Sequence, residues 1–275
     1  MEIEKLSALF NTPARREGLL KLVKDKKVKR IFAEGLQGSS VALFLSNLLH
    51  SGLQSMIVAN DPDEAGYLYN DLVQLCGDTD VVLFPSGYKR DIKYGQVDAP
   101  AGIMRTEALN RLAQKQPLIV VTSPEALAEK VVSGDTLTQQ TLRLSTSERA
   151  DIVKVSERLR MSGFAEVDYV YEPGQFAVRG SILDVYSFSN ELPYRVDFFG
   201  DDIESIRTFN VETQLSDEKL NEIFVISNMG RREVNGISIL DFIEKNTLFA
   251  FHNHDWAIDR IAAIASETMS EQTLI

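Results

Sequence analysis

The stretch "SMIVANDPDEAGYLYNDLVQLCGDTDVVLFP", residues 55–85, decides the predicted class of fold. It begins and ends with a short run of apolar residues, and the residues between these runs have helical spacing. Apolar strands joined by a helix of this length are typical of a parallel sheet with crossover helices. The stretch therefore predicts an α/β domain.

The same alternation continues on both sides of this stretch. Further strands are predicted at "VKRIFAEG" (28–35) and "PLIVVTS" (117–123), and further helices at 39–52 and 101–114. We therefore expect residues 1–140 to form one α/β domain.

The pattern changes at residues 141–227. An amphipathic helix that Gly163 ends is followed by a run rich in β-branched and aromatic residues, with turn signals at Pro173-Gly174 and Gly200-Asp201. This composition predicts a small α+β domain with an antiparallel sheet, inserted into the α/β domain. Residues 228–275 return to helix and strand, so the α/β domain is expected to resume there, and the chain is expected to be the N-terminal part of a longer protein.

The composition narrows the class of protein. The chain has 275 residues, is 44% hydrophobic and carries a formal net charge of −11. It shows no signal peptide and no apolar run long enough to cross a membrane, so we expect a cytoplasmic protein with no membrane association. Its single cysteine, Cys76, excludes an internal disulfide and a multi-cysteine zinc site. The acidic balance disfavours nucleic acid as a dominant partner.

A glycine-containing loop resembles a nucleotide-binding motif without completing it. Residues 35–40 read "GLQGSS", where a P-loop requires G-x-x-x-x-G-K-[ST]. Gly35, Gly38, Ser39 and Ser40 keep the glycines and hydroxyls, but the lysine that neutralises the phosphates is missing. The residues predict a degenerate phosphate loop in a RecA-like, P-loop-type domain, with the glycines kept by a sterically demanding turn.

A second segment lacks the residues that hold magnesium. The predicted strand "TLFAFHNHD" (247–255) ends in His252, Asn253 and His254, where a nucleotide-driven motor would carry acidic residues. Asp255 is interpreted as a helix cap before Trp256. The two histidines share a strand face and leave a metal site open as an alternative, although polar residues at a strand end are favoured. We therefore predict no catalytic residue, no metal and no cofactor for this chain, and a weak ATPase with an atypical P-loop stays open as an alternative.

Basic residues leave another alternative open. The cluster from Lys24 to Arg30 is interpreted as the solvated end of a helix and its linker. Together with Lys89, Arg90 and Lys93 it could also form a direct DNA-binding surface.

The predicted β-rich domain presents a different kind of surface. In "YRVDFF", residues 194–199, the apolar residues at every second position are expected to face the core. Arg195 and Phe199 then lie on the opposite, outward face, and Arg179 precedes a glycine nearby. Arginine and aromatic side chains are enriched among the residues that dominate protein interfaces. Pairing of these arginines with acids across the sheet is an equally good interpretation.

The longest motif resembles a known family. "EPGQFAVRGSILDVY" and "LPYRVDFFGDDIESIRTFNVETQLS" are similar to the second domain of bacterial transcription-repair coupling factors, and less closely to that of the repair protein UvrB. The segments "GLQGSSVALFL", "RTEALNRL" and "IVVTSPEAL" resemble the first domain of the same UvrB-like module. The resemblance covers nearly the whole chain.

This resemblance implies a function and a set of contact residues. The complete family member is an ATP-dependent DNA translocase that displaces stalled RNA polymerase from duplex DNA, with ATP and magnesium bound by motor domains outside this chain. The UvrB-like module recruits the nucleotide-excision-repair protein UvrA. The family's UvrA-contacting positions fall on Arg179, Arg195 and Phe199. The resemblance thus implies a non-catalytic recruitment module.

Overall fold

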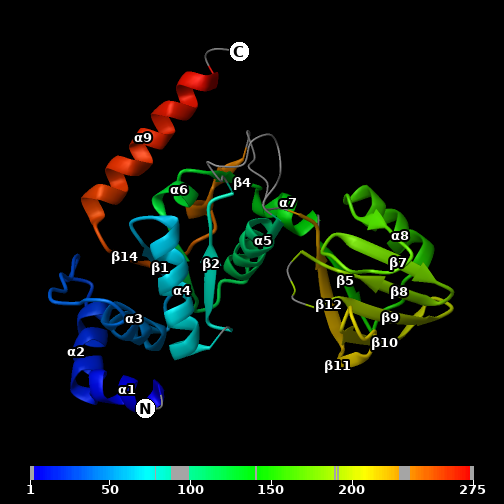
Figure 1. The fold of residues 1–275 in the computed structure, drawn as a ribbon, viewed down its shortest axis with the longest axis horizontal. Coiled ribbons are helices and arrows are strands. Elements are labelled where there is room, and N and C mark those ends of the chain that lie inside the picture. The colour runs from blue at the N-terminus through cyan, green and yellow to red at the C-terminus, as the bar shows by residue number, and fades with distance from the viewer. Residues whose placement is uncertain are drawn as a thin grey trace. The chain divides into compact units, whose positions relative to one another are not determined.

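The computed structural model describes residues 3–77, 79–87, 99–139, 141–188, 190, 192–228 and 236–272. The chain divides into two compact units (Figure 1), of which the first comprises Met1–Gln96, Ala108–Lys130 and Val234–Ile275, and the second Val97–Glu107 and Val131–Glu233. Among the described residues, no helix combines the length and apolarity needed to span a membrane.

The first unit contains a parallel sheet of four strands in the order β14-β1-β3-β2. Its elements are α1 (Ile3–Phe10), α2 (Pro13–Lys24), α3 (Ser40–Leu45), the 3-10 helix η1 (Ser46–Ser51), β1 (Ser55–Val58), α4 (Pro62–Cys76), β2 (Val81–Phe84), β3 (Ile119–Thr122), α6 (Pro124–Leu127), β13 (Ile237–Ser238), the 3-10 helix η2 (Ile239–Asp241), β14 (Leu248–Phe251) and α9 (His254–Gln272). The division between the units falls within α5 (Ala99–Ala113) and β4 (Lys130–Val131).

The apolar runs of the sequence form the centre of this sheet. All four residues of β1 and of β3 are buried, which is the usual state of parallel strands that are covered on both faces. Ile57, Leu72 and Ile119 belong to one core cluster that also includes residues of α3. Asp61 caps α4 by accepting a hydrogen bond from the Glu64 backbone at 2.8 Å, and this cap fixes where the helix begins. The predicted parallel sheet is therefore confirmed.

Two predicted elements of the first unit are wrong. Residues 28–35 form no strand, because their apolar side chains find no sheet to pack against: Phe32 is 86% exposed, and Lys29 and Arg30 are exposed beside it. Residues 238–246, with which the segment 228–275 was expected to resume in a helix, contain the last residue of β13 and the single turn η2, where the Ser238 side chain accepts the backbone N–H of Leu240. The expected helix at 39–52 is present but divided into α3 and η1.

The second unit is built on a six-stranded sheet in the order β11-β10-β9-β8-β7-β6. Its elements are α7 (Gly134–Gln139), β5 (Thr141–Ser145), α8 (Ile152–Met161), β6 (Ala165–Glu166), β7 (Gln175–Arg179), β8 (Ile182–Val185), β9 (Tyr194–Phe199), β10 (Asp202–Phe209), β11 (Ser216–Leu220) and β12 (Glu222–Ile226). Strands β7 to β11 are antiparallel, β6 joins β7 in parallel, and β5 pairs with β12 separately. The predicted antiparallel sheet is present.

Helix α8 covers one face of this sheet, as the sequence predicts. Val155 and Leu159 on the helix share a core cluster with Phe176, Val196 and Phe198 on the strands. The helix ends where Gly163 adopts a φ of +84°, a left-handed conformation that glycine takes without strain. The opposite face of the sheet carries Arg195 and Phe199.

Candidate functional site

The glycine loop of the first unit is exposed and follows irregular chain. Gly35 and Gly38 have φ angles of +80° and +54°, so both sites favour glycine for its backbone conformation. The expectation that this turn requires glycine is confirmed by these angles, and the requirement comes from the backbone conformation, because a Cβ at either position would meet no atom within 4 Å. Ser39 is the N-cap residue of α3 and makes no side-chain capping hydrogen bond, and the Ser40 hydroxyl donates to the Gln37 carbonyl at 2.7 Å. No strand leads into this loop.

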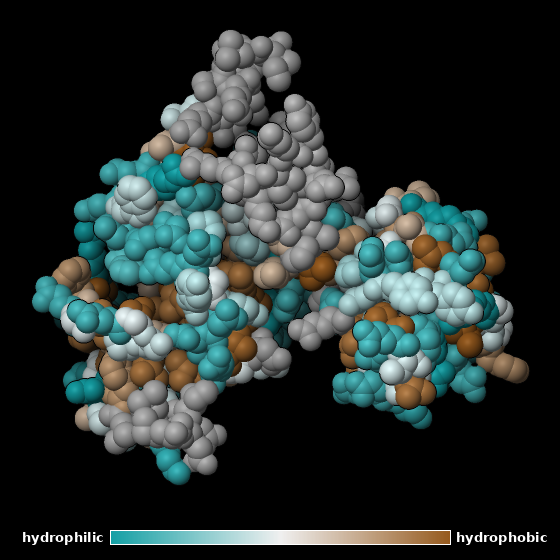
Figure 2. Space-filling view, in the orientation of Figure 1, coloured by the Kyte–Doolittle hydropathy of each residue, from teal (hydrophilic) through white to brown (hydrophobic). Residues whose placement is uncertain are grey.

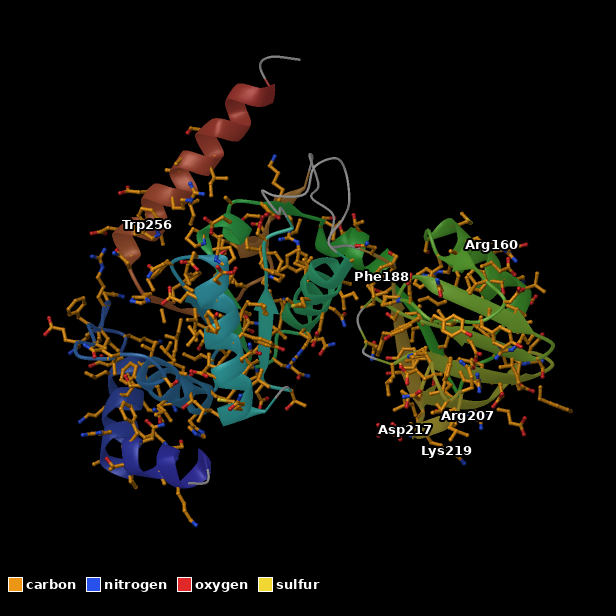
Figure 3. All side chains as sticks on the ribbon, in the orientation of Figure 1. Arg160, Phe188, Arg207, Asp217, Lys219 and Trp256 are labelled. Carbon is orange, nitrogen blue, oxygen red and sulfur yellow. The ribbon has the colours of Figure 1, made fainter. Side chains whose placement is uncertain are left out.

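The polar residues that follow β14 contact other residues of the first unit. His252 pairs with Glu64, and His254 Nδ1 lies 2.9 Å from Asp255 Oδ1. Asn253 accepts the backbone N–H of Trp256 at 3.1 Å, so Asn253 caps α9 and the interpretation of Asp255 as the cap is wrong. Trp256, labelled in Figure 3, is 51% exposed at the start of this helix. Within the described residues, no group of three or more His, Cys, Asp or Glu side chains could hold a metal ion.

The basic cluster from Lys24 to Arg30 begins at the last residue of α2 and continues through a turn, and its charged side chains are exposed. Lys89, Arg90 and Lys93 lie outside the described residues. Cys76, the last residue of α4, is partly buried, and burial raises the pKa of its thiol to about 11, which favours the protonated form over a nucleophilic thiolate.

The outward face of the second unit carries the predicted recognition residues. Along β9, Tyr194, Val196 and Phe198 are buried, whereas Arg195 is partly buried and Phe199 is exposed. The alternation that the sequence predicted is therefore confirmed. In Figure 2 the visible surface of this unit is mainly hydrophilic, with separate hydrophobic patches.

Arg179 and Arg195 meet at one buried carboxylate. Asp184, on the strand between them, is 1% exposed and contacts both guanidinium groups. Arg195 Nε donates to Asp184 Oδ1 at 2.7 Å and its Nη2 donates to Oδ2 at 2.8 Å, which is a bidentate pair. Hydrogen bonding to Asp184 raises the pKa of Arg195 above its usual range. The strand register explains the meeting, because Asp184 lies directly opposite Arg195.

Two loops complete the surroundings of these arginines. Arg179 Nη1 donates to the Asp168 carbonyl at 3.3 Å, and its guanidinium lies 4.9 Å from the centre of the Tyr169 ring. Arg195 donates to the carbonyl and to the side-chain oxygen of Gln214, at 3.2 and 3.1 Å. The guanidinium of Arg195 also lies 4.3 Å from the centre of the Phe209 ring. The site is thus a cationic cluster with aromatic neighbours.

Phe199 stands at the end of the hairpin that joins β9 and β10. Its partner across the hairpin is Asp202, and Gly200 makes the turn with a φ of +62°. The Phe199 side chain is 77% exposed, which is unusual for a residue of its size. Because its neighbour Phe198 lies in the core, the alternation of the strand places Phe199 on the outward face.

Asp184 and Tyr169 were not among the residues predicted from the sequence, whereas the alternative that the arginines pair with acids across the sheet is confirmed for Arg179, Arg195 and also Arg207. Arg207 contacts Asp197, which also accepts a hydrogen bond from the Ser205 hydroxyl at 2.6 Å. Arg207 is paired across the sheet with Lys219, and both are labelled in Figure 3. Asp184 and Asp197 occupy strand positions on the same face as the arginines. Which acid lies beside which arginine follows only from the register of the strands.

Comparison with known proteins bears directly on this unit. The family model described as "UvrB interaction domain" matches residues 142–229, a range that contains strands β6 to β12 and nearly all of β5. The chain carries a UvrB interaction domain. The candidate residues Arg179, Arg195 and Phe199 all lie within the matched range.

Proteins named transcription-repair-coupling factor are similar over most of the chain. The one from Myxococcus xanthus is 31% identical over 208 residues, 72% of this chain and 17% of that protein. Those from Bacillus subtilis (strain 168) and Escherichia coli (strain K12) are 26% and 27% identical over 197 and 199 residues, which is 71% of this chain and 17% of each relative. The chain therefore spans about a sixth of the length of the relatives that it matches.

Proposed function

We propose that this chain is a non-catalytic recruitment module in transcription-coupled nucleotide-excision repair, and that it binds UvrA through the outward face of β7 to β10. Two findings support this function. Residues 142–229 match a UvrB interaction domain, and the similar curated proteins are named for coupling transcription to repair. A UvrB interaction domain is expected to bind the partner that UvrB itself binds, which is UvrA.

One observation carries the proposal: an exposed phenylalanine lies on the same sheet face as an arginine cluster that the fold neutralises only in part. Arg179, Arg195 and Arg207 share two carboxylates, Asp184 and Asp197. The three guanidinium groups thus outnumber the two carboxylates that pair with them, although the whole chain has a formal charge of −11. Guanidinium groups beside an exposed phenylalanine suit a partner with acidic groups around an apolar pocket.

The experiment is a titration of purified UvrA with this chain, followed by isothermal titration calorimetry. We expect Arg179→Ala to weaken binding by roughly 30-fold or more, which corresponds to about 2 kcal/mol for an interface hot spot. Arg143→Ala is the matched control, because Arg143 is an exposed arginine of the same unit that pairs with Glu148 and Glu222 away from the cluster. Equal binding by the wild type and Arg179→Ala would refute the proposed surface.

The function of the longer protein is part of the same proposal. We infer that an ATP-dependent DNA translocase follows this module, that it displaces stalled RNA polymerase from duplex DNA, and that ATP and magnesium bind there. This chain then needs no cofactor of its own. The exposed glycine loop, with no lysine at Ser39 and no strand before it, supports a non-catalytic role for the first unit.

A further inference from the structure

The two arginines of the cluster differ in how many of their donors the fold uses. A guanidinium has five N–H groups. Among the described residues, Arg195 gives four of them to Asp184 and Gln214, and its side chain is only 13% exposed. Arg179 gives two, to Asp168 and Asp184, and its side chain is 33% exposed. Arg179 therefore keeps donors for a partner, whereas Arg195 is committed to the domain.

Asp184 contacts both Arg195, which is committed to the domain, and Arg179, which keeps donors for a partner. Its carboxylate is buried, and a buried carboxylate requires charged or hydrogen-bonding partners to offset its desolvation. Arg195 supplies the bidentate pair, so the carboxylate is fixed in position before it contacts Arg179. The Arg179 guanidinium is then held by three contacts, which it makes with the Asp184 carboxylate, the Asp168 carbonyl and the Tyr169 ring.

We propose that Asp184 is a positioning residue for partner binding: anchored by Arg195, it orients Arg179, which alone of the two arginines donates to a carboxylate of the partner. This inference rests on the proposed function. A long side chain loses rotamer freedom when it is ordered at an interface, and an arginine that is already held loses less. Phe199 supplies the apolar contact on the same face, and Arg195 acts through Asp184.

The proposal predicts that Asp184 matters only while Arg179 is present. We therefore compare Asp184→Asn in the wild type and in the Arg179→Ala background, by calorimetric titration of purified UvrA. In the wild type, loss of the charged contact is expected to weaken binding about tenfold. In Arg179→Ala the same change is expected to alter binding less than twofold, because the residue that Asp184 orients is gone.

Asp197→Asn is the matched control. It removes the same charge from the same face, but the Asp197 side chain contacts Arg207 and Ser205 instead of Arg179. Its effect is expected to be equal in the two backgrounds. This comparison separates orientation of Arg179 from a general change in surface charge, and thermal unfolding of each variant shows whether the unit stays folded.

If Asp184→Asn does not fold, Arg195→Lys takes its place. Lysine keeps the positive charge but cannot form the bidentate pair that fixes Asp184, so binding is again expected to weaken in the wild type and not in Arg179→Ala. Equal losses in both backgrounds would overturn the proposal, and so would tighter binding by Asp184→Asn, which would show that Asp184 competes with the partner. Absence of binding by the wild type would instead refute the proposed function.

Discussion

Phe199→Ala isolates the apolar part of the proposed interface. The side chain is 77% exposed, and an aromatic residue can bury roughly 150–250 Å² in total, so a partner could cover about 150 Å² of it. At about 25 cal/mol per Å² this area corresponds to about 4 kcal/mol. Interfaces recover only part of such a sum, because ordering and imperfect packing oppose it. We therefore expect a loss of about 2–3 kcal/mol, or roughly 30- to 150-fold in the dissociation constant for UvrA.

The same exposure predicts that the fold is unaffected. Phe199 fills no core position in the unit, so its truncation is expected to change the free energy of unfolding by no more than about 0.5 kcal/mol. Binding and stability therefore separate in this variant. Calorimetry with UvrA gives the first quantity, and chemical denaturation monitored by circular dichroism gives the second.

Met161→Ala is the matched control for this variant. Met161 is 89% exposed and ends α8, the helix that packs on the opposite face of the sheet. Its truncation removes a similarly exposed apolar side chain and is expected to leave UvrA binding unchanged. A loss of less than threefold for Phe199→Ala, or equal losses for the two variants, would refute the assignment of the outward face.

Three further predictions concern the stability and chemistry of the chain. Burial raises the pKa of Tyr194 to about 12, so the folded state disfavours the phenolate. The resulting contribution to the free energy of unfolding is fully present below about pH 10 and is lost as the pH rises towards 12. Tyr194→Phe is therefore expected to flatten the pH dependence of unfolding in this range. Leu159→Ala, at a position that is 1% exposed in the α8 core, is expected to destabilise the second unit by about 2–5 kcal/mol in denaturant titrations. Calorimetry with millimolar Mg-ATP is expected to give no binding heat, and a saturable isotherm would contradict the non-catalytic role of this chain.

The central elements of both units could be predicted from local sequence. Strands β1 and β3 are short apolar runs buried on both faces, and β9 alternates residue by residue between core and surface. These patterns report burial directly, because side chains of a strand alternate between its two faces. Phe199 was found by the same rule, since an aromatic residue on the polar side of an alternating strand must be exposed or covered by a partner.

Residues 28–35 show why the rest could not be predicted. Their composition suits a strand, but a strand also needs a neighbour with free backbone groups and an apolar surface to cover. Within the described residues of this segment, Ile31 and Phe32 instead lie exposed between charged residues, and neither requirement is visible in a local pattern. The prediction of the residue that caps α9 was wrong for a similar reason. Asn253 and Asp255 are both plausible capping residues, and only backbone geometry distinguishes them.

The arginines show the limit of the alternation rule most clearly. The rule places Arg195 on the outward face, and the structure agrees, but facing outward is not the same as being available. Most N–H donors of Arg195 are engaged by two groups. One is Gln214, which lies in a loop, and the other is the carboxylate of Asp184. Both contacts depend on the pairing of distant segments. If binding energy followed outward position alone, Arg195→Ala and Arg179→Ala would weaken UvrA binding without affecting the fold. Because Arg195 forms the bidentate pair with a buried carboxylate, we expect its removal to lower stability as well. Removal of Arg179 leaves that bidentate pair in place, so we expect it to lower stability less than removal of Arg195 does.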